Sequence, residues 1–175
     1  KRAFEIAVRL LGARKPKGGT ATVILDPGMV GLISHEAIGH TVEADFVLAG
    51  SIVKGKIGQQ VASEMITLVD SGLSERQHSG AGTVLVDDEG VIAQETVVID
   101  KGIMNSYLHN RESAELFDVA STGNARAYVY SDDPLIRMRN TYIEPGDYDF
   151  EEMVREIPQG YYLKGPLGGQ ADANG

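Results

Sequence analysis

Apolar side chains recur at helical spacing over residues 26–50, in the stretch DPGMVGLISHEAIGHTVEADFVLAG. From Met29 onward they follow one another closely enough to predict a mostly buried helix. Asp26 followed by Pro27 is a favourable helix start, because a carboxylate accepts unpaired backbone N–H groups and proline is tolerated in the first turn. The preceding residues 21–26, ATVILD, predict a buried strand. A strand that runs straight into a helix is therefore expected here.

The same patterns predict the other elements. Helical spacing or a capping signal predicts helices over 2–11, 113–119 and 149–157. Short apolar runs between turn signals predict strands over 61–70, 83–90, 125–130, 137–144 and 160–165, and a hairpin over 96–108. We expect helix 2–11 to pack on the core. Strands and helices that do not strictly alternate favour an α+β fold with a mixed or antiparallel sheet.

Polar residues interrupt the apolar helix as His35, Glu36 and His40, written HEAIGH. In the zinc-binding pattern HExxH the two histidines are four residues apart and share one face. Here they are five apart, so on a regular helix they would diverge by about 140°. A single wide π turn would bring them nearly into line. We predict such a turn near Gly39, since glycine tolerates unusual backbone angles and has no side chain to crowd a metal.

Composition narrows the class of protein. With 175 residues, 42% of them hydrophobic, residues 1–175 are expected to form one globular domain, with the glycine-rich segment 165–175 as a loop or truncated end. A net charge of −9 argues against a nucleic-acid surface. The absence of cysteine excludes a disulfide framework and agrees with a cytoplasmic setting. The sequence has no apolar run of membrane-spanning length and no signal-peptide pattern.

The stretch HEAIGHTVEAD resembles the HExxxH metallopeptidase motif of the TldD/PmbA family. Five later blocks support the resemblance, in order: VASEMITLVDSG at 61–72, DDEG at 87–90, YLHNRESA at 107–114, TGNAR at 122–126 and RMRNTYIEPGD at 137–147. The resemblance covers nearly the whole chain and indicates the TldD-like branch, which carries the zinc motif that PmbA-like proteins lack. It implies that the chain is the central part of a longer metallopeptidase.

The resemblance also implies roles for the residues of the motif. His35 and His40 match the family's two zinc ligands, and Glu36 matches the general base that activates the metal-bound water. The family's third zinc ligand is a cysteine near the C-terminus, and this chain contains none. Either that ligand lies beyond the sequence, or another group such as His78 or His109 replaces it.

Other polar residues are candidates for supporting roles. Glu43 lies on the same helix face as Glu36 and His40, where it either orients His40 as an outer carboxylate or is a simple exposed acid. The loop TGNAR makes Asn124 and Arg126 candidates for substrate binding. Arginines can grip a peptide carboxylate through paired hydrogen bonds. Arg126, Arg137 and Arg139 are equally suited to be strand-face charges that offset the acidic surface.

The resemblance implies a zinc-dependent peptidase that hydrolyses unfolded or leader-type peptides, together with a PmbA-like partner subunit or as a homo-oligomer. Neither direct nucleic-acid contact nor membrane attachment is expected. The alternative is a noncatalytic scaffold or partner-binding subunit that has lost the metal, which the missing cysteine favours. A regulator of a DNA enzyme that acts through protein contacts is a further alternative.

Overall fold

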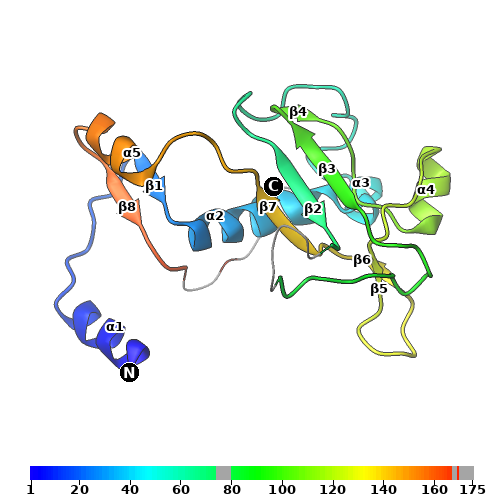
Figure 1. The fold of residues 1–175 in the computed structure, drawn as a ribbon, viewed down its shortest axis with the longest axis horizontal. Helices are drawn as coiled ribbons and strands as arrows, with labels where there is room; N and C mark the ends of the chain where they lie inside the picture. The colour runs from blue at the N-terminus through cyan, green and yellow to red at the C-terminus, as the bar shows by residue number, and fades with distance from the viewer. Residues whose placement is uncertain (74–79, 167–168, 170–175) are drawn as a thin grey trace.

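The computed structural model describes residues 1–73, 80–166 and 169 (Figure 1). Its helical elements are α1 (Arg2–Leu11), α2 (Pro27–Ile33), the π-helix η1 (Ser34–Gly39), the 3-10 helix η2 (His40–Val42), α3 (Ala44–Ala49), α4 (Arg111–Phe117) and α5 (Phe150–Glu156). Its strands are β1 (Val23–Leu25), β2 (Leu68–Ser71), β3 (Glu95–Asp100), β4 (Ile103–Met104), β5 (Ala125–Arg126), β6 (Leu135–Ile136), β7 (Asn140–Ile143) and β8 (Tyr161–Leu163).

Four antiparallel strands form the main sheet in the order β4-β3-β2-β7. The predicted hairpin is confirmed as β3 and β4, and its turn has positive φ at Lys101 (44°) and Gly102 (83°). Strand β7 forms one edge of this sheet and contacts α2 and η1. Two small sheets complete the described part of the chain: β1 with β8 in parallel, and β5 with β6 in antiparallel. The predicted α+β class is confirmed.

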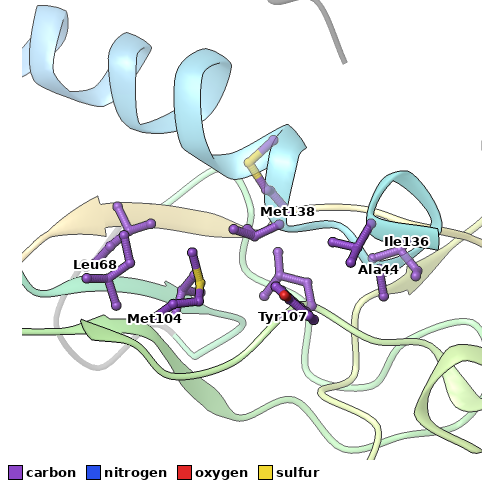
Figure 2. Close-up of a cluster of buried hydrophobic side chains, with 11 residues drawn as sticks. Ala44, Leu68, Met104, Tyr107, Ile136 and Met138 are labelled. Atoms are coloured by element: carbon purple, nitrogen blue, oxygen red, sulfur yellow. The ribbon is translucent and has the colours of Figure 1, made fainter. Parts of the chain in front are cut away.

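The hydrophobic core lies between the main sheet and the helical run that follows β1 (Figure 2). Buried side chains from η2 and α3 pack onto the sheet and the segments next to it. The cluster consists of Val42, Ala44, Val47, Leu68, Val98, Ile99, Met104, Tyr107, Leu108, Ile136 and Met138. The candidate chemistry is thus carried by a helix whose opposite side is fixed in the core.

The predicted strand-to-helix corner is also confirmed. Asp26 caps α2 with Oδ1, which accepts the Met29 N–H at 2.8 Å, and Pro27 occupies the first helical position. The other carboxylate oxygen of Asp26 accepts the Gly165 N–H at 3.0 Å, which ties the chain after β8 to the start of α2. Strand β1 is only half-buried rather than buried, because its one strand partner in the described chain is β8.

Helix α1 forms where it was predicted, but the expectation that it packs on the core is wrong for the part of the chain described. Phe4 is 73% exposed and Leu11 is 89% exposed. Figure 1 shows the helix at one end of the molecule, away from the main sheet. Helical periodicity identifies an apolar face, but it cannot say where that face lies relative to the core.

Several strands are shorter than predicted, and at 83–90 the side chain of Asp87 takes backbone N–H groups that a ladder would otherwise use. Residues 83–90 form no strand; Asp87 Oδ1 instead accepts the N–H groups of Glu89 (3.0 Å) and Val91 (2.8 Å). Strands also shrink at 61–70, 125–130 and 137–144, to β2, β5 and β7.

No helix in the described part of the chain has the length and apolar character needed to cross a bilayer. His78 and most of the glycine-rich segment 165–175 lie outside the described residues.

Candidate metal site

The helix that carries HEAIGH widens at the motif. Residues Ser34–Gly39 form a π-helix between the α-helix α2 and the 3-10 helix η2. The His40 N–H donates to the carbonyl of His35, five residues earlier, as a π turn requires. The two imidazole centroids lie 4.7 Å apart with their planes at 78°. The predicted wide turn is confirmed, and it brings together two rings that a regular helix would separate.

The reason for glycine at position 39 differs from the predicted one. Gly39 has ordinary helical angles, φ −55° and ψ −49°, so the turn needs no special backbone freedom there. A Cβ atom at this position would instead overlap the sulfur of Met138. Figure 2 shows the Met138 side chain reaching the helical segment from the core. Glycine is required here because another part of the chain approaches its backbone.

Glu43 follows the wide turn and is fully buried, with 0% of its surface exposed. Its Oε2 lies 3.2 Å from His40 Nδ1 and 3.8 Å from Arg137 Nη1, and its Oε1 accepts the Met138 N–H at 3.2 Å. Burial raises the pKa of Glu43, and the contacts with His40 and Arg137 oppose that rise. Of the two predicted alternatives, the exposed acid is excluded. When Glu43 is ionised, its carboxylate accepts a hydrogen bond from a proton on His40 Nδ1. The lone pair of His40 Nε2 is then free to accept a hydrogen bond or to bind a metal ion.

His35 and Glu36 lie on the more open side of the turn. His35 is exposed and Glu36 is half-buried. Partial loss of water around His35 lowers its pKa, as does the neighbouring His40, while Glu36 and Asp70 act in the opposite direction. A lowered pKa favours the neutral imidazole, which is the form that binds a metal. The chain also returns to this side at Gly169, where a Cβ atom would lie 2.8 Å from Glu36 Cγ.

No third ligand joins the two histidines within the described residues, where no group of three or more His, Cys, Asp or Glu side chains could hold a metal. His109 is 3% exposed; its Nδ1 lies 3.1 Å from Ser113 Oγ, and its ring packs edge-on against Phe117. Burial lowers its pKa to about 4. His109 is therefore a neutral core histidine. His78, the other candidate, lies outside the described residues.

Asp70 on β2 is the residue near the site that sequence reasoning missed. It is 0% exposed, and its carboxylate accepts four hydrogen bonds. The donors are the Arg139 N–H (2.8 Å), Arg139 Nε (3.0 Å), Thr141 Oγ1 (2.9 Å) and Asn124 Nδ2 (2.8 Å). The only sequence signal was an acid in the apolar run TLVDSG. A buried acid with this many donors organises the structure around it.

The predicted substrate residues lie in different settings. Asn124 is 2% exposed, and both of its amide protons are used, on Asp70 and on the Arg137 carbonyl. Arg126 is exposed on β5. Of the other arginines, Arg139 is wrongly predicted as a strand-face charge, since its side chain is 3% exposed and paired with Asp70. A substrate role for Asn124 and Arg126 stays a prediction.

An apolar cavity of about 430 Å³ lies beside the wide turn. Its helical wall consists of Ala37, Ile38 and Thr41, of which Ala37 directly follows Glu36 in the sequence. The remaining lining is Ile52, Val53, Lys56, Gln60, Val61, Ala62, Ile99 and Met104.

The family's sequence model, described as the PmbA/TldA metallopeptidase C-terminal domain, matches residues 18–175. The chain belongs to this family. A metalloprotease from Methanothermobacter thermautotrophicus is 43% identical over 173 residues, which cover 98% of this chain and 37% of that protein. A zinc metalloprotease TldD homolog from Saccharolobus solfataricus is 40% identical over 168 residues, 96% of this chain and 37% of that protein. The chain thus spans a little over a third of the length of these relatives.

Two solved structures share the fold of this PmbA/TldD-family chain. A proposed modulator of a DNA gyrase from Thermotoga maritima superimposes with a TM-score of 0.77 at 28% identity, over 94% of this chain and 37% of that one. TldE from Thermococcus kodakarensis superimposes with a TM-score of 0.70 at 24% identity, over 87% of this chain and 36% of that one, which speaks for the fold alone. The family resemblance expected from the sequence blocks is confirmed.

Proposed function

We propose that this chain supplies two zinc ligands and the general base of a peptidase. The observation that carries the proposal is the wide turn, which holds the His35 and His40 rings 4.7 Å apart with Glu36 directly after the first of them. A pair of imidazoles and an adjacent carboxylate is the donor set expected of metal-assisted hydrolysis. The metalloprotease names of the relatives support the same interpretation.

In this proposal His35 and His40 hold the zinc ion. The contact of His40 Nδ1 with Glu43 leaves Nε2 for the metal, and the lowered pKa of His35 keeps its ring neutral. Catalytic zinc normally has three protein ligands. We assign the third to a part of the protein beyond this chain, in line with the cysteine that the family resemblance implies. When bound, zinc would polarise the scissile carbonyl and make the attacking water more acidic.

Two further residues have proposed roles, one in proton transfer and one in orienting a zinc ligand. Glu36 takes the proton of the attacking water and passes it to the leaving amine. Glu43 holds the His40 ring in one orientation. Asn124 and Arg126 stay candidates for substrate contacts, Arg126 through its exposed guanidinium and Asn124 through the loop that it fixes.

The proposed substrate is an unfolded or leader-type peptide, because a peptide must be extended for its scissile carbonyl to reach the metal site. Exposed strand edges bind such extended peptides by backbone pairing. The proposed setting is cytoplasmic, with a PmbA-like partner subunit or a second copy of the protein.

Peptide hydrolysis by the full-length protein tests the role of Glu36. We expect Glu36→Gln to retain zinc but to lose at least about a hundredfold in kcat, the usual scale of general-base catalysis. Glu115→Gln, an exposed glutamate on α4, is the matched control and should keep full activity. Undiminished turnover by Glu36→Gln would remove Glu36 from the reaction.

A second candidate function is a noncatalytic subunit, favoured by the lack of a third ligand within the described residues. Elemental analysis after dialysis separates the two. About one zinc per full-length chain, lost in His40→Ala, supports the peptidase. No zinc in the unsubstituted full-length protein supports the noncatalytic subunit.

A further inference from the structure

The wide turn at the histidines is in contact with a core side chain from the segment just before β7. The sulfur of Met138 lies against the backbone of Gly39, in the space that a Cβ atom would fill. Met138 itself is 4% exposed and belongs to the main hydrophobic cluster. A π turn is a rare departure from the regular α-helix, so a contact that fixes its shape matters.

Two buried carboxylates hold the segment that carries Met138. The Met138 N–H donates to Glu43 Oε1 at 3.2 Å, and the next N–H, of Arg139, donates to Asp70 Oδ1 at 2.8 Å. Both acids are 0% exposed. Arg139 adds a side-chain bond to Asp70 at 3.0 Å. Because consecutive N–H groups bond to acids on two different segments, Glu43 before α3 and Asp70 on β2, this stretch has little freedom to slide along the helix.

The packing of Met138 also opposes a change of helical register. If the wide turn became a regular helix, the helix would shift its register by one residue. Ile38 or His40 would then face the Met138 sulfur in place of Gly39. Either residue has a Cβ atom, for which the structure leaves no room at that point. The helix beyond the turn is fixed separately, since the Ala44 N–H donates to the Leu108 carbonyl at 3.0 Å.

We propose that Met138 is a positioning residue that maintains the wide turn by packing on Gly39, and that Glu43 and Asp70 hold it there. It acts on the histidines only through the backbone. Close core packing allows few alternative arrangements, so removing the contact should change the relative position of the His35 and His40 rings. The inference goes beyond the proposed function because it concerns the shape of the turn, whether or not zinc binds.

The experiment is a double-mutant cycle in the full-length protein, with Gly39→Ala, Met138→Ala and the double variant. The first readout is amide hydrogen exchange of the metal-free protein at the His40 N–H, which bonds to His35 across the turn. The second is zinc affinity by competition with a chelator. We expect each single variant to speed exchange of this amide and to weaken zinc binding about tenfold or more, the scale seen when groups that orient ligands are removed.

In the double variant, the methyl group added at position 39 occupies the space that the shortened side chain at position 138 leaves free. We therefore expect the double variant to bind zinc at least about tenfold more tightly than multiplying the losses of the two single variants would give. Such a departure from additivity shows that residues 39 and 138 are directly coupled. Met138→Leu, which keeps the volume, should stay close to the unsubstituted protein in both readouts.

Two variants separate positioning from general destabilisation. Met104→Ala removes a methionine that is 1% exposed in the same core, and it should lower the thermal midpoint without speeding exchange at His40 selectively. Gly31→Ala adds a methyl group to the same helical run, where it meets nothing within 4 Å, and should be silent.

Equal effects of Met138→Ala and Met104→Ala on the His40 amide, or strictly additive effects of the Gly39 and Met138 changes, would overturn the proposal. If the unsubstituted protein binds no zinc, the peptidase proposal fails, and the exchange measurement alone still decides the role of Met138.

Discussion

His40 Nδ1 lies 3.2 Å from Oε2 of Glu43, and that carboxylate is fully buried. The same carboxylate accepts the Met138 N–H, so one acid joins the imidazole, the wide turn and the segment before β7. An ionised carboxylate in this place needs its partners, because burial alone raises its pKa. The orientation of the ring and the position of the 137–139 segment are therefore coupled through Glu43.

Replacing Glu43 by glutamine should weaken zinc binding by about tenfold to a hundredfold, because a neutral amide holds the imidazole less firmly and does not fix its tautomer. Zinc affinity of the full-length protein, measured by competition with a chelator, checks this prediction. Glu64→Gln is the matched control, since Glu64 is an exposed glutamate in the loop before β2. Equal zinc affinity in the two variants would show that Glu43 serves the fold and not the ligand.

The buried pair of Asp70 and Arg139 gives a prediction about stability. Asp70→Asn should destabilise the fold by about 3–5 kcal/mol, because it leaves a 3% exposed guanidinium without its counter-charge. Within the described residues, Arg139 Nη1 and Nη2 have no hydrogen-bond partner, so Nε and Asp70 carry the whole interaction. The midpoint of urea unfolding measures the effect.

A second substitution makes that prediction specific. Changing Asp70 and Arg139 together, to Asn and Met, should recover part of the lost stability, because no buried charge then remains unpaired. A double variant as unstable as the sum of the two single variants would place the destabilisation in the other bonds of Asp70, to Asn124 and Thr141.

Local signals in the sequence were sufficient for the turn at HEAIGH and for the caps. The five-residue spacing of His35 and His40 allows a shared side only if the helix widens, and Asp26 and Asp149 cap α2 and α5 as predicted. These features depend on neighbours within a few residues, so a sequence pattern can contain them. The stretches that resemble the TldD/PmbA family indicated the family and the extent of the match along the chain, but not which segments contact one another.

The features that failed to emerge from the sequence are contacts between distant segments. Gly39 is explained by Met138, 99 positions later in the sequence, and the break between β6 and β7 at 137–139 by hydrogen bonds to Glu43 and Asp70. An apolar stripe such as that of α1 predicts which face of the helix is apolar, but not which part of the protein that face packs against. Asp70 looked like an ordinary strand residue, because only the tertiary structure surrounds it with four donors.

Removal of the proposed zinc ion should lower the thermal midpoint of the full-length protein, since a ligand that binds only the folded state stabilises it by mass action. At a free zinc concentration of about a hundred times the Kd, the expected gain is about 2.7 kcal/mol. Scanning calorimetry with and without a chelator measures the shift. His40→Ala should unfold at the same temperature in both conditions; an equal chelator effect in that variant would locate the stabilising metal elsewhere.

The buried His109 predicts how stability depends on pH. Its pKa is about 4 in the folded chain and about 6.5 when unfolded, because burial disfavours the charged ring. Above pH 6.5 both states are neutral at this residue, and it adds no pH dependence. Between pH 6.5 and about 4 the unfolded state takes up a proton that the folded state does not, so stability falls as pH falls. The loss from this residue reaches about 3 kcal/mol at pH 4 and then levels off.

His109→Gln removes this titration, so the free energy of unfolding should fall less steeply over that range than in the unsubstituted protein. Urea unfolding at intervals between pH 7 and pH 4 compares the two slopes. Ser113→Ala is the control: it deletes the hydroxyl 3.1 Å from Nδ1 but leaves the ring buried against Phe117, so its slope should match that of the unsubstituted protein. Because burial and not the Ser113 contact lowers the pKa, a flattened slope in Ser113→Ala would contradict the argument, as would parallel slopes for His109→Gln and the unsubstituted protein.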